Sequence, residues 1–498
     1  MKRILKYTLS ALLVATSAAF TSCDDFLTME PTNSGNAIGA IATVNDAQVA
    51  INGIMNNMTS SSYYGRNMLL YADAKGGDLT IYSVGRGSDA LYTFNHTANS
   101  GSYSGFWSRG FNCILQANAL LENINIQEAA GNIEDFSFVK GQTLTLRALF
   151  YFDLVRLYGL PYNYDKTAYG VPNITEPLPT DAQPGRATVV ENYTQILKDL
   201  EEGAELMASN KKPQNGYISY YANLALQARV KLYMEDWDGA FKAAKEVIDD
   251  KQYSLYSPED WCHSWTQQFG SESIFELGIT PEESDLGTTS LGYYYMRYGQ
   301  VKNAQGWFLA SDYFLNRLGE DDTDVRWGIM GNDEYWVETG TERKGACYKY
   351  MGGTDLKGDG KATNTAVNIK IIRLSEVYLI AAEAALHSTL PEAGAEVAAG
   401  YLNEIRRRAP KLAPATAATI TDDMILDERS KELFGEGHRF FDMIRKNKSI
   451  EYNDDFQDVP VSQRDKVIDR TFYKIVLPIS QDEMNANATI AKQQNKGY

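Results

Sequence analysis

The stretch from Gly141 to Pro161, GQTLTLRALFYFDLVRLYGLP, predicts a helix that is apolar on almost every side. Its polar minority consists of Thr143, Thr145, Arg147, Asp153 and Arg156. Such a helix is stable only when other elements cover more than one of its faces. Gly159 and Pro161 predict its end, because glycine takes the left-handed cap conformation and proline cannot continue the helical hydrogen bonds.

Two further segments have the pattern of antiparallel helical hairpins. The first runs from Tyr220 to Glu235, turns at 236–239 and returns in a helix to Asp250. The second is predicted over Ile369–Leu386 and Glu392–Arg408. Small alanine side chains in both pairs allow the helices to approach closely. Neither pair meets the strict tetratricopeptide consensus, so the pattern predicts a mainly α fold built on tetratricopeptide-like hairpins.

The remaining segments divide into helices and irregular chain. Residues 60–104 are rich in Tyr, Gly and Ser and are predicted to form surface loops. Residues 252–367 have little helical period, with strand-like alternation near Tyr335–Tyr350, and predict an irregular lobe over the helical scaffold. Further helices are predicted over Asp46–Met58 with Asn45 as cap, Phe106–Ile124, Val189–Met207, Met424–Phe434 and His438–Lys446.

The first 23 residues differ from the rest of the chain. A basic start at Lys2, Arg3 and Lys6 precedes the apolar run Tyr7–Phe20, which is too short to span a bilayer comfortably. This pattern predicts a cleaved secretory signal. The small residues before Cys23 resemble a bacterial lipobox, in which that cysteine becomes the lipidated first residue of the mature protein.

The central stretch, read as G-x-x-x-x-L-R-A-L-x-Y-F-x-L-x-R-L-Y-G-x-P, resembles the core signature of the SusD/RagB family of outer-membrane nutrient-binding lipoproteins. The order W-x-x-x-x-x-x-I-x-x-A-N from Trp107, the segment GEGHRFFDMIR at 435–445 and the chain's ending also resemble the family. The resemblance implies a scaffold of four tetratricopeptide-like hairpins. It also implies three segments: a lipoprotein signal peptide at 1–22, a lipidated tether at 23–36, and one SusD-like domain at 37–498 with the lobe at 252–367 inserted.

Composition and motifs argue against several function classes. A net charge of -17 and a pI near 4.8 argue against nucleic-acid binding, which requires a basic footprint. The four histidines show no metal-ligand spacing, so neither a metal nor a cofactor is expected. His438 is interpreted as part of a buried polar network rather than a catalytic pair, and Asp355–Gly360 as a hairpin tip rather than a calcium loop. A disulfide among Cys113, Cys262 and Cys347 is left open.

The excess of aromatic residues points to the ligand. The chain has 32 Tyr and 7 Trp, many of them outside the predicted helices, where exposed rings provide flat platforms for the apolar face of a sugar. The same excess also fits core packing. The resemblance implies a shallow site built from the loops before the Trp107 helix and from the irregular lobe. The candidate ligand-binding residues are Tyr82, Arg86, Trp265, Tyr294 and Trp307.

The resemblance implies a non-enzymatic lipoprotein, anchored through Cys23 and facing the cell exterior. It would bind an oligo- or polysaccharide and deliver it to a SusC-like TonB-dependent outer-membrane transporter. A peptide-binding member of the same family is an alternative. A glycoside hydrolase is another, which requires two carboxylates about 5 to 10 Å apart, and a purely structural helical-repeat scaffold is the third.

Overall fold

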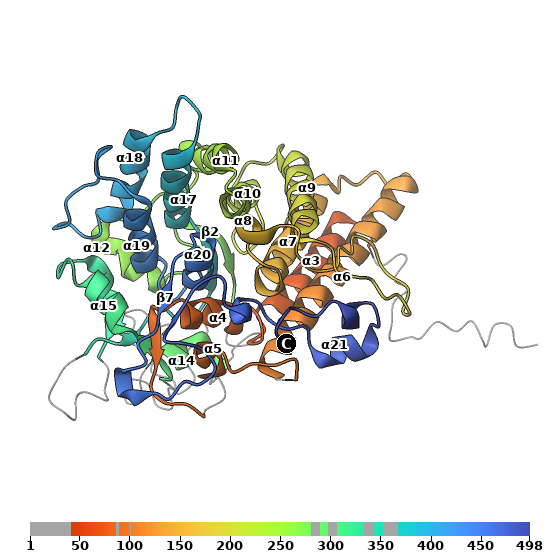
Figure 1. Ribbon diagram of the computed structural model, residues 1–498. Coiled ribbons are helices and arrows are strands. Elements are labelled where there is room, and N and C mark those ends of the chain that lie inside the picture. Colours follow the sequence, from red (N-terminus) through yellow and green to blue (C-terminus); the bar gives the residue numbers. More distant parts are fainter. Residues whose placement is uncertain are drawn as a thin grey trace, which may run out of the picture.

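The computed structural model describes residues 41–85, 89–99, 101–279, 289–296, 306–332, 343–351 and 367–498. Most of the regular structure in this part of the chain is helical, and the helices are distributed over the whole width of the molecule (Figure 1). The predicted signal peptide and tether, together with Cys23 and Asp355–Gly360, lie outside the described residues. No helix within these ranges is both long and apolar enough to cross a membrane.

The central helix α7 (Ser137–Tyr158) is buried on nearly all sides, as its sequence predicts. It packs against α6 (Gly101–Ala129) and α9 (Val189–Met207), and α3 (Val44–Met58) contacts it as well. Where α7 and α9 cross, a Cβ added to Gly141 would lie 2.7 Å from the carbonyl oxygen of Gly203. The two helices therefore approach so closely that only glycine fits at this point.

The predicted left-handed cap at Gly159 is wrong. Gly159 has an extended backbone with φ -106°, and its N–H donates to the carbonyl of Val155. An added Cβ would lie 3.0 Å from both the Val155 oxygen and Cγ2 of Val189. Close packing beside α9, rather than a left-handed turn, accounts for the glycine.

The first hairpin is confirmed, as α10 (Tyr220–Met234) and α11 (Trp237–Asp249). Its turn places Glu235 in the left-handed conformation, and the Asp236 carboxylate accepts a hydrogen bond of 3.1 Å from the N–H of Gly239. The second hairpin consists of α17 (Leu374–His387) and α18 (Ala395–Arg406). Because α11 packs on α17, the two hairpins form one continuous layer.

The second hairpin begins later than the sequence pattern predicts. Ile369–Arg373 is not helical but forms strand β6, which pairs antiparallel with β2 (Ser273–Leu277). The three isoleucines at 369, 371 and 372 favour a strand, and a partner almost 100 residues away stabilises it. This pairing ties the irregular lobe to the helical layer.

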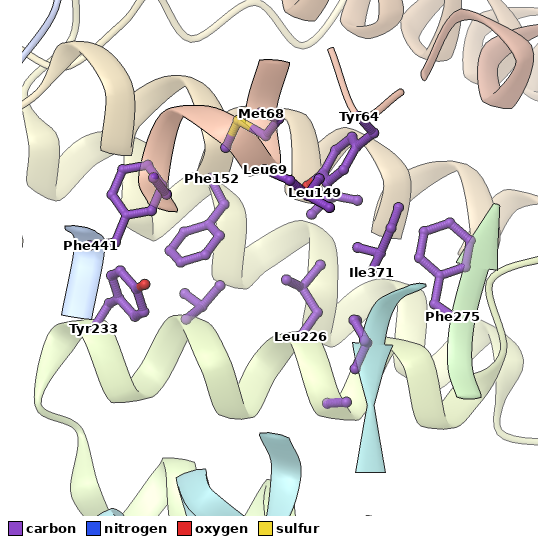
Figure 2. Packing of buried hydrophobic residues seen from close by; sticks show 14 of the residues in the cluster. Tyr64, Met68, Leu69, Leu149, Phe152, Leu226, Tyr233, Phe275, Ile371 and Phe441 are labelled. Atoms are coloured by element: carbon purple, nitrogen blue, oxygen red, sulfur yellow. The ribbon is translucent and has the colours of Figure 1, made fainter. Parts of the chain in front are cut away.

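Residues 60–104 were predicted to be surface loops, and this prediction is wrong for the part that forms α4 (Asn67–Lys75). Every residue of α4 except Asn67 is buried, and Tyr71 is completely inaccessible. Figure 2 shows Met68 and Leu69 of α4 in one hydrophobic cluster with side chains of α7, α10, β2 and β6. One hydrophobic cluster extends from Ile41 to Ile490.

Short elements complete the described fold. The start of α3 differs from the prediction, because Thr43 rather than Asn45 caps it and forms a capping box with Asp46. The described part of the predicted strand-like stretch Tyr335–Tyr350 contains only the two-residue strand Ala346–Cys347. The remaining elements are β1 (Leu79–Ile81), α5 (Asp89–Thr93), α8 (Tyr162–Asp165), α12 (Pro258–Trp261), α14 (Leu291–Tyr295), β3 (Phe308–Ala310), α15 (Asp312–Leu318), β4 (Met330–Gly331), β5 (Ala346–Cys347), α19 (Asp422–Glu432), α20 (Arg439–Arg445), β7 (Ile450–Glu451), β8 (Val467–Ile468) and α21 (Gln481–Ala486).

Charged side chains fill the space between the strand pair and α19. We name this group the central ion network, and it consists of Glu272, Lys349, Arg373, Arg408, Glu432 and Glu436, all buried. Arg373 contacts three carboxylates at 2.7 to 3.1 Å, those of Glu436, Glu272 and Glu432. Burial alone would raise the pKa of Glu432, but the nearby arginines, Arg408 first among them, lower it to about 2.

The end of the chain closes over the central helix. The Asn495 side-chain amide donates to the carbonyls of Tyr158 and Leu477 at 2.9 and 2.7 Å. The Arg186 guanidinium donates to the same Tyr158 carbonyl at 2.8 Å and to the carbonyl of Gln493 at 2.6 Å. The last turn of α7 therefore obtains hydrogen-bond donors from Arg186, 28 positions further along the chain, and from Asn495, 337 positions further.

Candidate functional site

Two of the predicted ligand-binding residues meet where a short strand pair ends. Strand β1 pairs antiparallel with β3, and Ile81 lies opposite Phe308. This register places Tyr82, directly after β1, beside Trp307, directly before β3. The N–H of Tyr82 donates to the carbonyl of Trp307 at 3.3 Å, and both residues are half-buried.

A third predicted residue, Tyr294, packs against the Trp307 ring. Tyr294 lies on α14, which contacts β3 and lies away from the hairpin of α17 and α18 (Figure 1). Its ring centroid is 5.2 Å from that of Trp307, in an edge-to-face arrangement. Tyr294 is only 8% exposed. Its predicted role as an open stacking platform is therefore corrected to a supporting one.

Arg66, which the sequence analysis did not identify, holds Tyr294 in place. Its guanidinium carbon lies 4.4 Å from the centre of the Tyr294 ring. Its Nη1 donates to the Tyr294 hydroxyl and to the carbonyl of Thr289, both at 3.0 Å. Burial lowers the pKa of Arg66, while the Tyr294 hydroxyl opposes that shift. No motif surrounds this arginine, so the sequence offered no signal for it.

We call Arg66, Tyr82, Tyr294 and Trp307 the aromatic cluster. It combines two half-buried aromatic residues with a third, buried ring that packs on Trp307 and a guanidinium that packs on this third ring. An arrangement of this kind suits a flat, weakly polar ligand surface and holds no acid–base pair. Arg86, predicted for the same region, lies outside the described residues.

Trp265 is not an exposed platform, and that prediction is wrong. It is 2% exposed and lies within 6.1 Å of the rings of Trp261 and Tyr350. The Nζ of Lys349 lies 4.4 Å from the centre of its ring, and Arg373 lies 5.1 Å away. Trp265 therefore forms the apolar wall of the central ion network, and no ligand reaches it without unfolding this region.

The buried position expected for His438 is confirmed. Burial lowers the pKa of His438 to about 4, although Glu376 opposes the shift from 3.9 Å. Glu376 already makes a two-pronged contact with the Arg229 guanidinium, at 2.7 and 2.5 Å. The carboxylate is therefore engaged in holding α10 to α17, and the histidine does not form a catalytic pair with it.

Two other predictions concern metal and disulfide chemistry. Within the described ranges, no three His, Cys, Asp or Glu side chains are grouped so that they would hold a metal ion. Cys113, Cys262 and Cys347 are free thiols. The disulfide that the sequence analysis left open is therefore not present among these three residues.

Known proteins share both the sequence pattern and the fold. Residues 25–232 match a family model described as "Starch-binding associating with outer membrane", and residues 293–498 match the SusD family model. A SusD superfamily protein of Bacteroides thetaiotaomicron is 34% identical, with a TM-score of 0.80 over 91% of this chain and 99% of that one. A SusD superfamily protein of Bacteroides vulgatus is 35% identical, with a TM-score of 0.80 over 92% and 99%.

A curated relative extends the match along the whole chain. The SusD-like protein P25 of Formosa agariphila is 22% identical over 96% of this chain and 97% of its own length. The central helix and hairpins, which first suggested the resemblance, therefore lie within a match that spans nearly the entire sequence. The chain belongs to the SusD/RagB family.

Proposed function

We propose that this protein binds a glycan outside the cell and delivers it to a SusC-like TonB-dependent outer-membrane transporter, without transforming it. The family description as starch-binding and associated with the outer membrane supports a carbohydrate ligand. A lipid on Cys23 would hold the protein to the membrane, after removal of residues 1–22 and with residues 23–36 as tether.

The aromatic cluster is the observation on which the proposal depends. Tyr82 and Trp307 are half-buried at one strand end, and Tyr294, which Arg66 holds, packs edge-to-face on Trp307. A sugar ring has one apolar face, which packs on such a ring, while its hydroxyl groups bond to polar neighbours or water. Rigid elements on both sides hold the rings in position before the ligand arrives, which lowers the entropic cost of binding.

Binding is tested by affinity electrophoresis in gels that contain amylopectin, laminarin, xylan or alginate, with a set of peptides titrated in parallel. We expect at least one polysaccharide to retard the wild-type protein. Trp307→Ala and Tyr82→Ala should weaken that binding by about 5- to 150-fold, by analogy with the 1 to 3 kcal/mol of a base stacked on an aromatic ring. Tyr164→Ala removes a tyrosine that is 41% exposed outside the cluster and is the matched control.

The same samples separate the alternatives. Binding of peptides without binding of any polysaccharide would favour the peptide-binding alternative. Release of shorter sugars from the bound polysaccharide, abolished by one carboxylate substitution, would establish an enzyme. If the wild type binds neither class, the proposal of a capture protein fails.

A further inference from the structure

A second groove lies apart from the aromatic cluster and shares no residue with it. It has a volume of about 700 Å³ and is bordered by α3, the segment 215–217 before α10 and the end of β2. This volume is within the range of about 300 to 1,000 Å³ that is typical of small-molecule sites. Thr59 is one of its lining residues, and the connection from α3 to α4 runs from there to Arg66 of the aromatic cluster.

The groove is uncharged although the chain is rich in charge. None of the described residues that line it has a charged side chain, whereas 22% of the whole sequence is charged. A ligand in this groove finds no ion-pair partner on its walls. Phosphates, uronic acids and charged peptide side chains would lose hydration here without compensation.

Amide groups supply the polar part of the lining. Asn52 and Asn56 lie one helical turn apart on the solvent face of α3, and Asn215 lies on the facing segment. All three are exposed, and among the described residues their side chains have no hydrogen-bond partner. Each amide provides both donors and an acceptor, which matches the hydroxyl group of a sugar, itself donor and acceptor.

An aromatic ring lies between two glycines at the other wall. Phe269 has φ 51°, a conformation that phenylalanine rarely adopts, and its N–H donates to Oε1 of Glu276 at 3.1 Å. A Cβ added to Gly216 or to Gly278 would lie 3.5 or 3.6 Å from the ring. The two glycines therefore place no side chain against this half-buried ring, and the half-buried Tyr217 lies beside them.

The floor of the groove on α3 is also open. Gly53 lies in the interior of α3, is exposed, and has no atom within 4 Å of the position of an added Cβ. Glycine is among the least favourable residues in a helix interior, and packing does not require it here. Because Gly53 has no side chain, a ligand can approach the helix backbone between Asn52 and Asn56.

We infer that this groove is a second contact site for a neutral polysaccharide, used together with the aromatic cluster by chains long enough to reach both. The inference rests on the proposed function for its ligand class. Uncharged walls, free amides and a half-buried ring without a side chain from either glycine against it favour a neutral sugar over an acidic one. A trisaccharide bound at the aromatic cluster does not need the groove, whereas a polymer gains affinity from it.

The test fills the groove without harming the fold. Gly53→Gln adds a neutral side chain with good helix propensity into open space, so its melting temperature should not be lower than that of the wild type. Gly400→Gln is the matched control, because Gly400 is also an exposed glycine within a helix, α18, with no atom within 4 Å of an added Cβ. The double variant Asn52→Ala/Asn56→Ala removes the amides instead of blocking them.

Affinities are measured for amylopectin, laminarin and xylan, and for the trisaccharide of whichever polymer binds the wild type. We expect Gly53→Gln and the double alanine variant to weaken polymer binding at least threefold, with trisaccharide binding and Gly400→Gln unchanged. Polymer binding equal to wild type in both groove variants would overturn the inference while leaving the proposed function intact. Loss of binding in the groove variants but not in Trp307→Ala would overturn only the placement at the aromatic cluster. A wild type that binds none of the three neutral polymers refutes the groove as a neutral-sugar site, whereas retardation by alginate alone would still support a glycan-binding protein.

Discussion

Replacing Arg373 with methionine removes the cation that three buried carboxylates share. In the wild type its guanidinium contacts Glu436, Glu272 and Glu432, and it also donates to the carbonyl of residue 432 at 3.2 Å. Methionine has a similar length and no charge, and its thioether suits the neighbouring Trp265 ring. The substitution therefore removes charge and hydrogen bonds while leaving little empty space.

The remaining contacts set the size of the effect. Glu272 and Glu432 each keep Arg408, at 2.6 and 2.9 Å, and Glu436 keeps Lys349 at 2.7 Å. Each carboxylate therefore retains a cation, and the net change is one uncompensated buried charge rather than three. Removing one partner of a buried ion pair costs about 3 to 5 kcal/mol, and we expect Arg373→Met to lower the free energy of unfolding by that amount.

Urea titration followed by circular dichroism at pH 7 measures this loss, with Arg407→Met as control. The Arg407 side chain is 65% exposed and pairs with Glu404 at 3.1 Å, so its removal should cost less than about 1 kcal/mol. The stabilisation from Glu432, whose pKa is lowered to about 2, is present above the ordinary carboxyl range and is lost as the pH falls toward 2. In the variant the pKa of Glu432 rises. The difference in the free energy of unfolding between wild type and Arg373→Met should therefore become smaller between pH 7 and about pH 4. A loss below about 1 kcal/mol, or a deficit that widens at pH 4, would refute the reasoning.

Three further outcomes follow from the fold and the sequence. Trp265→Ala should lower the free energy of unfolding by about 3 to 5 kcal/mol. Any loss of ligand binding should match the loss of folded protein. Weaker ligand binding by a variant of unchanged stability would instead place Trp265 in the ligand site. Cys23→Ala should move the protein from the membrane fraction to the soluble fraction, and a wild type that fatty-acid labelling does not mark would contradict the lipid anchor. Deleting residues 495–498 removes the Asn495 amide from the carbonyls of Leu477 and Tyr158, although Arg186 still donates to the latter, so the free energy of unfolding should fall by at least about 1 kcal/mol in a urea titration. An unfolding midpoint equal to wild type would show that the chain end does not close the fold.

The elements that the sequence predicted well are those decided by local spacing. The central helix and the hairpin of α10 and α11 carry their apolar pattern within one stretch, and the structure has them at nearly the predicted bounds. The sequence predictions were wrong where contacts with residues distant in the sequence determine the local structure. The isoleucine-rich segment Ile369–Arg373 could be a helix or a strand by its sequence, and it is a strand because β2 pairs with it. Gly159 was predicted to be a left-handed helix cap, but its close approach to Val189 accounts for the glycine at this position.

The candidate site could be predicted by region and less well by its members. Aromatic composition and the family resemblance pointed to the segments that hold Tyr82, Tyr294 and Trp307, which the structure brings together. Their meeting depends on a three-residue strand pair that joins residues more than 220 positions apart, which no periodicity indicates. Trp265 has the same irregular sequence context as Trp307, yet Trp261, Tyr350 and Lys349 bury it. Composition cannot distinguish the two tryptophans, because only tertiary contacts separate them.

The late position of the residues that close α7 has a kinetic consequence. At about 5 to 20 residues per second, a ribosome completes a chain of 498 residues in roughly 25 to 100 s. The Tyr158 carbonyl receives its Asn495 donor only at the very end of that time. A nascent chain therefore lacks the final contacts of its own central helix for as long as it is being made. Such a delay favours translocation in an unfolded state, which is the state that the proposed secretory signal requires.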